Sequence, residues 1–127
     1  MDVEQRPVET TDDAAEALAA LLAVLDTCLV ELAGARERAE HLLDARRSGR
    51  AWLDIVTEER RPLVVEQIST VMAALSTAGG AWRREQAYAL QSEQVSINRI
   101  AALFGVTRQR ISALLRDRAE AAAAGIR

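Results

Sequence analysis

One apolar repeat near the N-terminus constrains the fold of this 127-residue chain more than any other feature. Between residues 18 and 42, apolar or small residues recur at alternating steps of three and four, which is the a/d pattern of a helix that packs along one stripe. Gly34 is the only interruption, and one glycine costs a helix only about 1 kcal/mol. The pattern predicts a single helix over residues 13–47, about 50 Å long at about 1.5 Å per residue. The repeat comprises Leu18, Leu21, Leu25, Cys28, Leu32, Ala35, Ala39 and Leu42.

A helix of this length needs a partner along its leucine stripe. We expect a second copy of the chain to cover part of it, as a homodimeric coiled coil or an intermolecular bundle. The alternative is that residues 62–78 of the same chain fold back onto the stripe. Cys28 is expected to be a small core residue, with a redox switch across the dimer as the minor alternative. The expected dimer seam consists of Leu18, Leu21, Leu25, Cys28, Leu32 and Leu42.

The segment SINRIAALFGVTRQRISALLR, residues 96–116, predicts a helix-turn-helix. Ser96 is expected to cap the first helix, because its hydroxyl accepts a hydrogen bond from a free amide of the first turn. A glycine at the corner adopts positive φ at no steric cost, and Thr107 is expected to cap the second helix. Val106 is expected to plug the corner between the helices. The positions that shape the motif are Ala101, Gly105, Val106, Ile111 and Leu114.

The outward positions of the second helix are polar or basic. A recognition helix presents the side chains of its N-terminal turns to base edges in the major groove of double-stranded DNA. We expect base contacts from Thr107, Arg108, Gln109 and Ser112, because arginine and glutamine match guanine and adenine through paired hydrogen bonds. A helical hairpin that only packs is the alternative. Contacts to phosphates are expected from Arg99, Arg110 and Arg116.

The run FGVTRQRI, followed by Ala119, resembles the helix-turn-helix in region 4 of bacterial primary sigma factors, which typically read F-G-V-T-R-E-R-I there. Gln109 stands where that family has an acidic residue, and the second helix continues as SALLRDRAE rather than as the usual R-Q-I-E run. The match covers about a fifth of the chain. The stretch from Leu90 to Leu115 also resembles small actinobacterial helix-turn-helix regulators. The resemblance implies a DNA-binding role for the motif residues, without promoter recognition by the whole chain.

Charge divides the sequence in two, although the net charge is only −3. Residues 1–79 hold 8 basic and 15 acidic side chains, whereas residues 80–127 hold 8 basic and 4 acidic ones. The basic part coincides with the predicted helix-turn-helix, as binding to phosphates requires. Many alanines, few aromatic residues and only two prolines favour helices over sheets.

We therefore predict an all-α protein with a long N-terminal dimerisation helix and a helical C-terminal domain that contains the helix-turn-helix. Residues 1–12 are expected to form a disordered tail, residues 13–78 an assembly region and residues 80–127 the DNA-binding domain. Pro62 is predicted to begin a helix that ends near Thr77, with a hinge at Gly79 and Gly80 before a further helix over 81–93. Trp52 is expected to anchor the long helix to the C-terminal domain.

Sites for catalysis are not apparent. His41 is the only histidine, no nucleotide-binding or metalloprotease motif occurs, and a single cysteine excludes an internal disulfide. We expect no metal, no cofactor and no enzymatic activity. We also expect no signal peptide and no apolar run long enough to span a bilayer, which favours the bacterial cytoplasm and nucleoid.

The sequence thus predicts a homodimeric, sequence-specific DNA-binding regulator of transcription. One alternative is an interaction module whose acidic, leucine-rich arm binds a sigma factor or another transcription protein. A second is a nucleoid-associated protein, which docks on DNA without a preferred operator.

Overall fold

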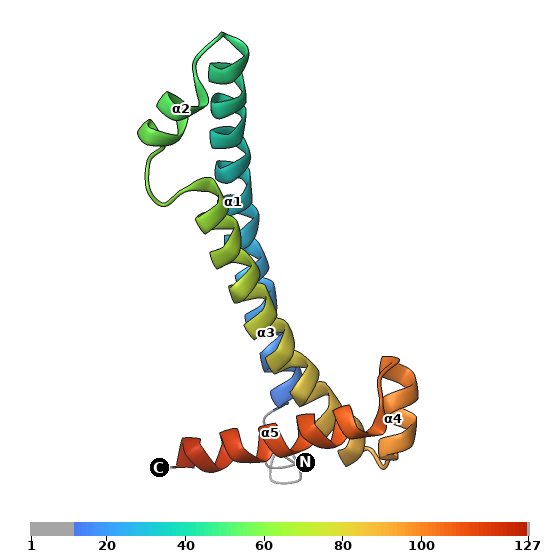
Figure 1. The fold of residues 1–127 in the computed structure, drawn as a ribbon. Coiled ribbons are helices and arrows are strands. Elements are labelled where there is room, and N and C mark those ends of the chain that lie inside the picture. The colour runs from blue at the N-terminus through green and yellow to red at the C-terminus, as the bar shows by residue number, and fades with distance from the viewer. Residues whose placement is uncertain (1–11, 127) are drawn as a thin grey trace. The chain divides into compact units, whose positions relative to one another are not determined.

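The protein is all-α in the computed structural model, which describes residues 12–126 (Figure 1). All regular structure within that range is helical, as the composition predicts. The expected disordered tail lies outside the described residues, apart from Asp12. The five helices are α1 (Asp13–Arg47), α2 (Trp52–Glu58), α3 (Val64–Ser92), α4 (Ile97–Phe104) and α5 (Arg108–Ile126).

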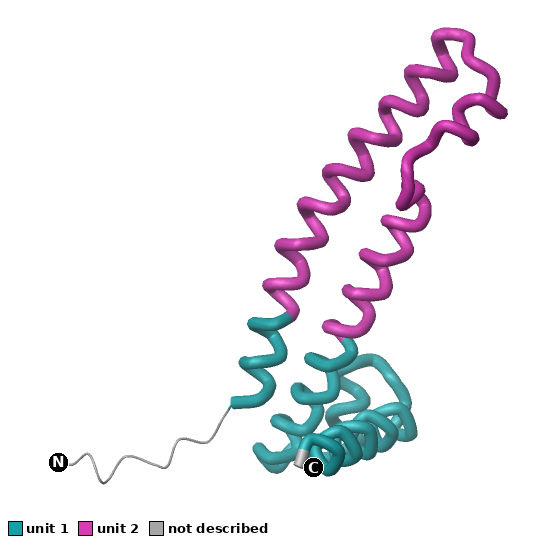
Figure 2. The backbone as a smooth tube through the Cα atoms, turned by 90° about the vertical axis from the view of Figure 1, so that its left-hand side faces the viewer, with its two compact units in different colours: residues 1–20, 80–127 teal, residues 21–79 magenta. Residues whose placement is uncertain are grey.

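The chain forms two compact units (Figure 2). Residues 21–79 form the first, which we call the hairpin unit. Residues 1–20 and 80–127 form the second, the C-terminal unit, described here over 12–20 and 80–126. The two boundaries fall within α1 and α3, so both long helices contribute to both units.

The long N-terminal helix is confirmed, with ends that local hydrogen bonds explain. Asp12 caps its start, because the Ala15 amide donates to Asp12 Oδ1 at 3.0 Å. Gly49 has a φ of +104° just past the other end. There the Arg50 amide donates to the Ala45 carbonyl at 3.2 Å, which satisfies a free carbonyl of the last turn.

The predicted end of a helix near Thr77 is wrong, because α3 runs through Gly79 and Gly80 to Ser92, although the boundary between the two units falls between these glycines, where the sequence predicts a hinge. Each glycine costs a helix interior only about 1 kcal/mol, and a growing helix gains one backbone hydrogen bond for each residue it fixes. The helix also begins at Val64 rather than at Pro62. Its first amide donates to Glu59 Oε2 at 2.8 Å, so a carboxylate outside the helix satisfies its start.

In the hairpin unit, α1 and α3 lie side by side and antiparallel (Figures 1 and 2). Cys28 on α1 and Val71 on α3 are both buried, and the Cys28 thiol lies 4.0 Å from the Val71 carbonyl oxygen. Gln67 Nε2 donates to the Glu31 carbonyl at 3.1 Å and holds the same two helices together. The centre of the leucine stripe therefore packs on the same chain, which was the alternative to a dimer.

This packing corrects the expected dimer seam at Cys28, which faces α3 of its own chain and is only 4% exposed. Leu21 and Leu42 are half-buried, whereas Leu18, Leu25 and Leu32 remain exposed. The a/d repeat thus splits into residues that the chain itself covers and residues that it leaves open.

Trp52 is not the predicted core anchor, because it is 54% exposed. Only Ile55 among the apolar residues of α2 is buried, since a helix this short turns a single position toward its neighbour. The Arg46 guanidinium lies over the Trp52 ring, 5.2 Å from its centroid. This tryptophan therefore packs on the C-terminal end of α1.

The expectation that no apolar run reaches bilayer length is also wrong. By length and composition alone, α1 is long and apolar enough to cross a membrane. Only 6% of its most apolar stretch is buried, so most of the apolar surface of α1 is uncovered in the structure.

Candidate nucleic-acid interface

A small closed core supports α4 and α5. It takes one buried side chain from the C-terminal half of α3 and two each from α4 and α5, and Ile100 and Ile111 are fully buried. The interdigitated side chains fix the angle between the two helices. The core residues are Ala87, Ile100, Ala101, Ile111 and Leu114.

Local hydrogen bonds set both ends of α4 as the sequence predicts. Ser96 Oγ accepts a hydrogen bond from the Arg99 amide at 3.1 Å. Gly105 has a φ of +69°, and the following amide, that of Val106, donates to the Ala101 carbonyl at 3.0 Å. A Cβ at Gly105 would meet nothing within 4 Å, so the left-handed backbone and not lack of space calls for glycine here.

The connection before α4 uses the same geometry without a glycine. Gln94 has a φ of +70°, and the amide of Val95 donates to the Leu90 carbonyl at 3.0 Å. Val95 and Leu90 both pack against the core. The turn therefore joins α3 to α4 at a defined angle.

Val106 differs from its expected role. It is 38% exposed, so it covers the corner between α4 and α5 only in part. Ala101, 6% exposed, and Ile111 fill the corner instead. The small side chain of Ala101 thus lets α4 and α5 approach closely at the corner.

The side chains expected to contact bases are mostly accessible. Thr107, Arg108 and Gln109 are exposed at the start of α5, whereas Ser112 is half-buried. Thr107 Oγ1 accepts a hydrogen bond from the Arg110 amide at 3.1 Å, which confirms it as the cap of α5. Arg108 Nη1 donates to Asn98 Oδ1 at 3.2 Å, a contact that the sequence analysis missed.

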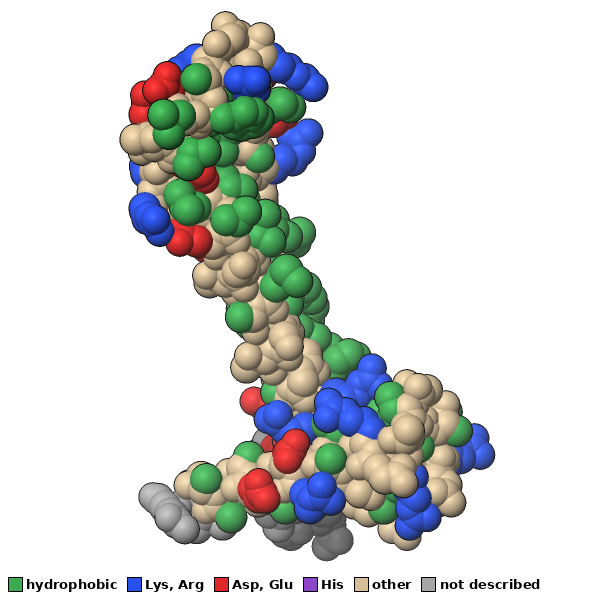
Figure 3. Space-filling model, in the orientation of Figure 1, with side chains coloured by type: hydrophobic (Ala, Val, Ile, Leu, Met, Phe, Trp, Pro, Cys, Tyr) green, Lys and Arg blue, Asp and Glu red, His purple; other side chains and the backbone are tan. Residues whose placement is uncertain are grey.

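Four exposed arginines on α4 and α5 form no ion pair with any residue in the described range: Arg99, Arg108, Arg110 and Arg116. Figure 3 shows blue arginine side chains bordering α4 and the start of α5. In the hairpin unit, three arginines each pair with a glutamate at 2.7–3.0 Å, whereas three others are exposed and form no ion pair with a described residue. The paired ones are Arg36, Arg50 and Arg61, and the others are Arg46, Arg47 and Arg60. The four arginines of α4 and α5 differ in lying together on one helix pair, with their charge available.

A further arginine, Arg118, anchors α5 to the rest of the C-terminal unit. Its guanidinium bonds to Glu85 Oε1 at 3.2 Å and Asp13 Oδ2 at 3.0 Å, and lies 3.7 Å from the centroid of the Tyr88 ring. Burial lowers the pKa of this guanidinium, but the hydrogen bond and charge of Glu85 outweigh burial, so the pKa is raised. Arg118 follows Ile111 by seven residues and Leu114 by four, so helical spacing places it on the same buried stripe, and this spacing was the available sequence signal.

Arg83 also has an intramolecular role. Its guanidinium lies 4.4 Å from the centroid of the Phe104 ring, so it packs on the end of α4.

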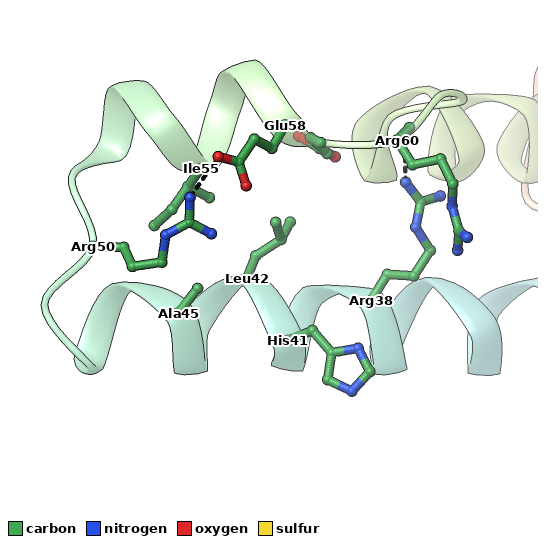
Figure 4. A pocket seen from close by; sticks show the side chains of 9 residues that line it. Arg38, His41, Leu42, Ala45, Arg50, Ile55, Glu58 and Arg60 are labelled. Atoms are coloured by element: carbon green, nitrogen blue, oxygen red, sulfur yellow. Dashed lines mark hydrogen bonds and ion pairs between the residues drawn. The ribbon is translucent and has the colours of Figure 1, made fainter.

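The hairpin unit contains a cavity of about 330 Å³ between α1, α2 and the segment that follows α2 (Figure 4). Leu42 points into it from α1, and His41 points away from it. Arg50 pairs with Glu58 at 2.7 Å, and Arg38 bonds to the Arg60 carbonyl, so its polar groups already have partners. No group of three potential metal ligands occurs within residues 12–126.

Comparison with protein-family models, with curated proteins and with solved structures finds no match to this chain.

Proposed function

We propose that this protein binds double-stranded DNA with sequence preference and regulates transcription as a homodimer in the bacterial cytoplasm. One observation carries the proposal: a rigid pair of helices with a glycine corner displays four arginines that have no carboxylate partner among the described residues. Exposed guanidinium groups of this kind match a polyanion, because each neutralised phosphate releases condensed counterions.

The start of α5 supplies the groups for reading bases. Gln109 is exposed and forms no hydrogen bond with another described residue, so its amide is available to adenine. Asn98 steadies the Arg108 side chain from α4, which reduces the entropy lost when that guanidinium binds guanine. The Thr107 hydroxyl caps the helix and keeps its own hydrogen to donate. Base reading is thus assigned mainly to Arg108 and Gln109.

The experiment is selection of preferred duplexes from a random pool, followed by mobility shifts at two salt concentrations. Arg108→Gln should relax the preference at one base pair, at a cost of about 1–3 kcal/mol in discrimination. Arg116→Gln should weaken all duplexes alike and lower the salt slope by about 1. Arg36→Gln, which removes an exposed arginine from the hairpin unit, serves as the matched control and should change neither property.

Absence of a shift at low salt would contradict DNA binding. Binding without sequence preference would identify the nucleoid-associated alternative. A second candidate function, docking of another transcription protein, is favoured by α2, where Trp52, Leu53 and Val56 are 54–77% exposed. If the protein binds another transcription protein but does not bind DNA, this second candidate is supported.

A further inference from the structure

Both helices of the hairpin unit leave large apolar side chains uncovered. We call these seven residues the hairpin face, and they are between 38% and 66% exposed. On each helix these residues are spaced three and four positions apart, which is the spacing of a helix face that packs against a partner. The hairpin face consists of Leu22, Leu25, Leu29 and Leu32 on α1, and Val65, Ile68 and Met72 on α3.

Helix geometry places the two stripes on the same side of the hairpin. Cys28 and Val71 mark the buried contact line between α1 and α3. Leu29 follows the first and Met72 follows the second, so each lies about 100° around its helix from that line, at 3.6 residues per turn. Because the two helices are antiparallel, equal rotations of the same sense lead to the same side of the pair. The stripes therefore form one continuous surface.

The parts of α1 and α3 that carry this surface contain almost no charged side chains, as is typical of buried helices. Residues 67–82 of α3 contain no charged side chain, and residues 17–30 of α1 contain only Asp26. A helix that meets water on its outer side ordinarily carries charges there.

We infer that a second copy of the chain covers the hairpin face, so that two hairpins pack into an intermolecular four-helix bundle. This inference deepens the proposed function, because it names the surface through which the homodimer forms. It differs from the predicted seam: two helices of each copy take part, and Cys28 stays inside its own chain.

The size of the hairpin face suits a second copy. Two helices side by side are about 20 Å wide, and the 15 residues from 21 to 35 span about 22 Å at 1.5 Å per residue. The projected area is on the order of 450 Å² per copy before side-chain relief is counted, which is about half of a standard interface and matches the low end of specific interfaces, so we expect a dimer whose population depends on concentration. A two-fold axis makes such a patch complementary to itself, since apolar residues meet apolar residues.

The test is the mass of the full chain in solution, by light scattering after gel filtration over a wide concentration range. The wild type should be a dimer, and Leu29→Lys should raise the dimer dissociation constant at least roughly a hundredfold, because a lysine ammonium would be buried without a partner. Val30→Lys is the matched control. Val30 is 73% exposed and lies one residue, about 100°, beyond the hairpin face, so its variant should remain a dimer.

Cross-linking keeps the inference testable if Leu29→Lys fails to fold. In a Cys28→Ala background, a cysteine scan of the hairpin face (Leu22, Leu25, Leu29, Ile68 and Met72) should include at least one position that forms a disulfide between copies, because in a two-fold interface the residues nearest the axis meet their equivalents. Val30→Cys in the same background should stay reduced.

Three results would overturn the inference: a wild-type monomer at every concentration, equal loss of dimer in the Val30→Lys control, or partition of wild-type monomers into uncharged lipid vesicles through α1. Failure here and failure of the proposed function are distinguishable. Arg108→Gln should lose DNA preference and remain a dimer, whereas Leu29→Lys should keep a salt-sensitive shift with a single half-site and lose dimer mass.

Discussion

The hairpin unit and the C-terminal unit use the same residue types in opposite ways. In the C-terminal unit, Ile100 and Ile111 are fully buried, and four arginines are exposed along the helix pair α4 and α5 without an ion pair to a described residue. In the hairpin unit, large leucines are exposed, and half-buried or exposed arginines stand beside several glutamates that pair with some of them. The exposed arginines of α4 and α5 suit an anionic partner, and the exposed leucines suit an apolar one.

The difference also predicts where stability resides. The C-terminal unit has a closed core that the chain completes by itself. The hairpin core contains few buried side chains, and most of them are small. They are Cys28, Ala35, Ile55 and Val71. Hydrophobic burial scales with the apolar area removed from water, so the hairpin gains less from its own chain and more from a partner.

The largest effect should come from the core of the C-terminal unit. Ile111→Ala removes three buried carbons at a position with no exposed surface, and should lower the free energy of unfolding by about 2–5 kcal/mol. The measurement is denaturant unfolding followed by tryptophan fluorescence. Val71→Ala in the hairpin is the comparison, and it should cost less, because a smaller side chain is truncated in a thinner core. Equal costs would remove the contrast between the two units.

An intermediate effect is expected at Arg118. Arg118→Gln removes two ion pairs and a stacked guanidinium from a side chain that is 20% exposed, and should cost about 1–2 kcal/mol in unfolding free energy. Arg36→Gln is the control, since that pair with Glu40 is 76% and 54% exposed and should be worth below about 0.5 kcal/mol. If both substitutions cost the same, Arg118 does not anchor α5.

Much of this contrast was accessible from local sequence patterns. The α1 repeat, the Ser96 cap and the Gly105 turn each depend on residues a few positions apart, and all three are confirmed. The exposure of Arg108 and Gln109 follows from helical phase in the same way, although a role of either in DNA binding stays a prediction.

The features that sequence reasoning missed depend on residues far apart in the chain. The contact from Arg118 to Asp13 joins two ends of the sequence, and the packing of Cys28 on Val71 selects one of two open alternatives for the leucine stripe. α3 continues through Gly79 and Gly80 although each glycine costs a helix about 1 kcal/mol. A cost this small can be outweighed by packing elsewhere along the helix, so glycine alone does not predict where the helix ends.

The smallest effect tests that balance directly, with two glycines in opposite settings. Gly105→Ala places a Cβ on a left-handed backbone and should destabilise the protein by about 1 kcal/mol, although nothing lies within 4 Å. Gly80→Ala has the same free space but a helical backbone, so it should stabilise the protein by about 0.5–1 kcal/mol. Because an added Cβ meets nothing within 4 Å at either site, thermal unfolding of both variants compares mainly the two backbone conformations. A shift of the same sign in both would show that neighbouring side chains, and not φ, select glycine at the corner before α5.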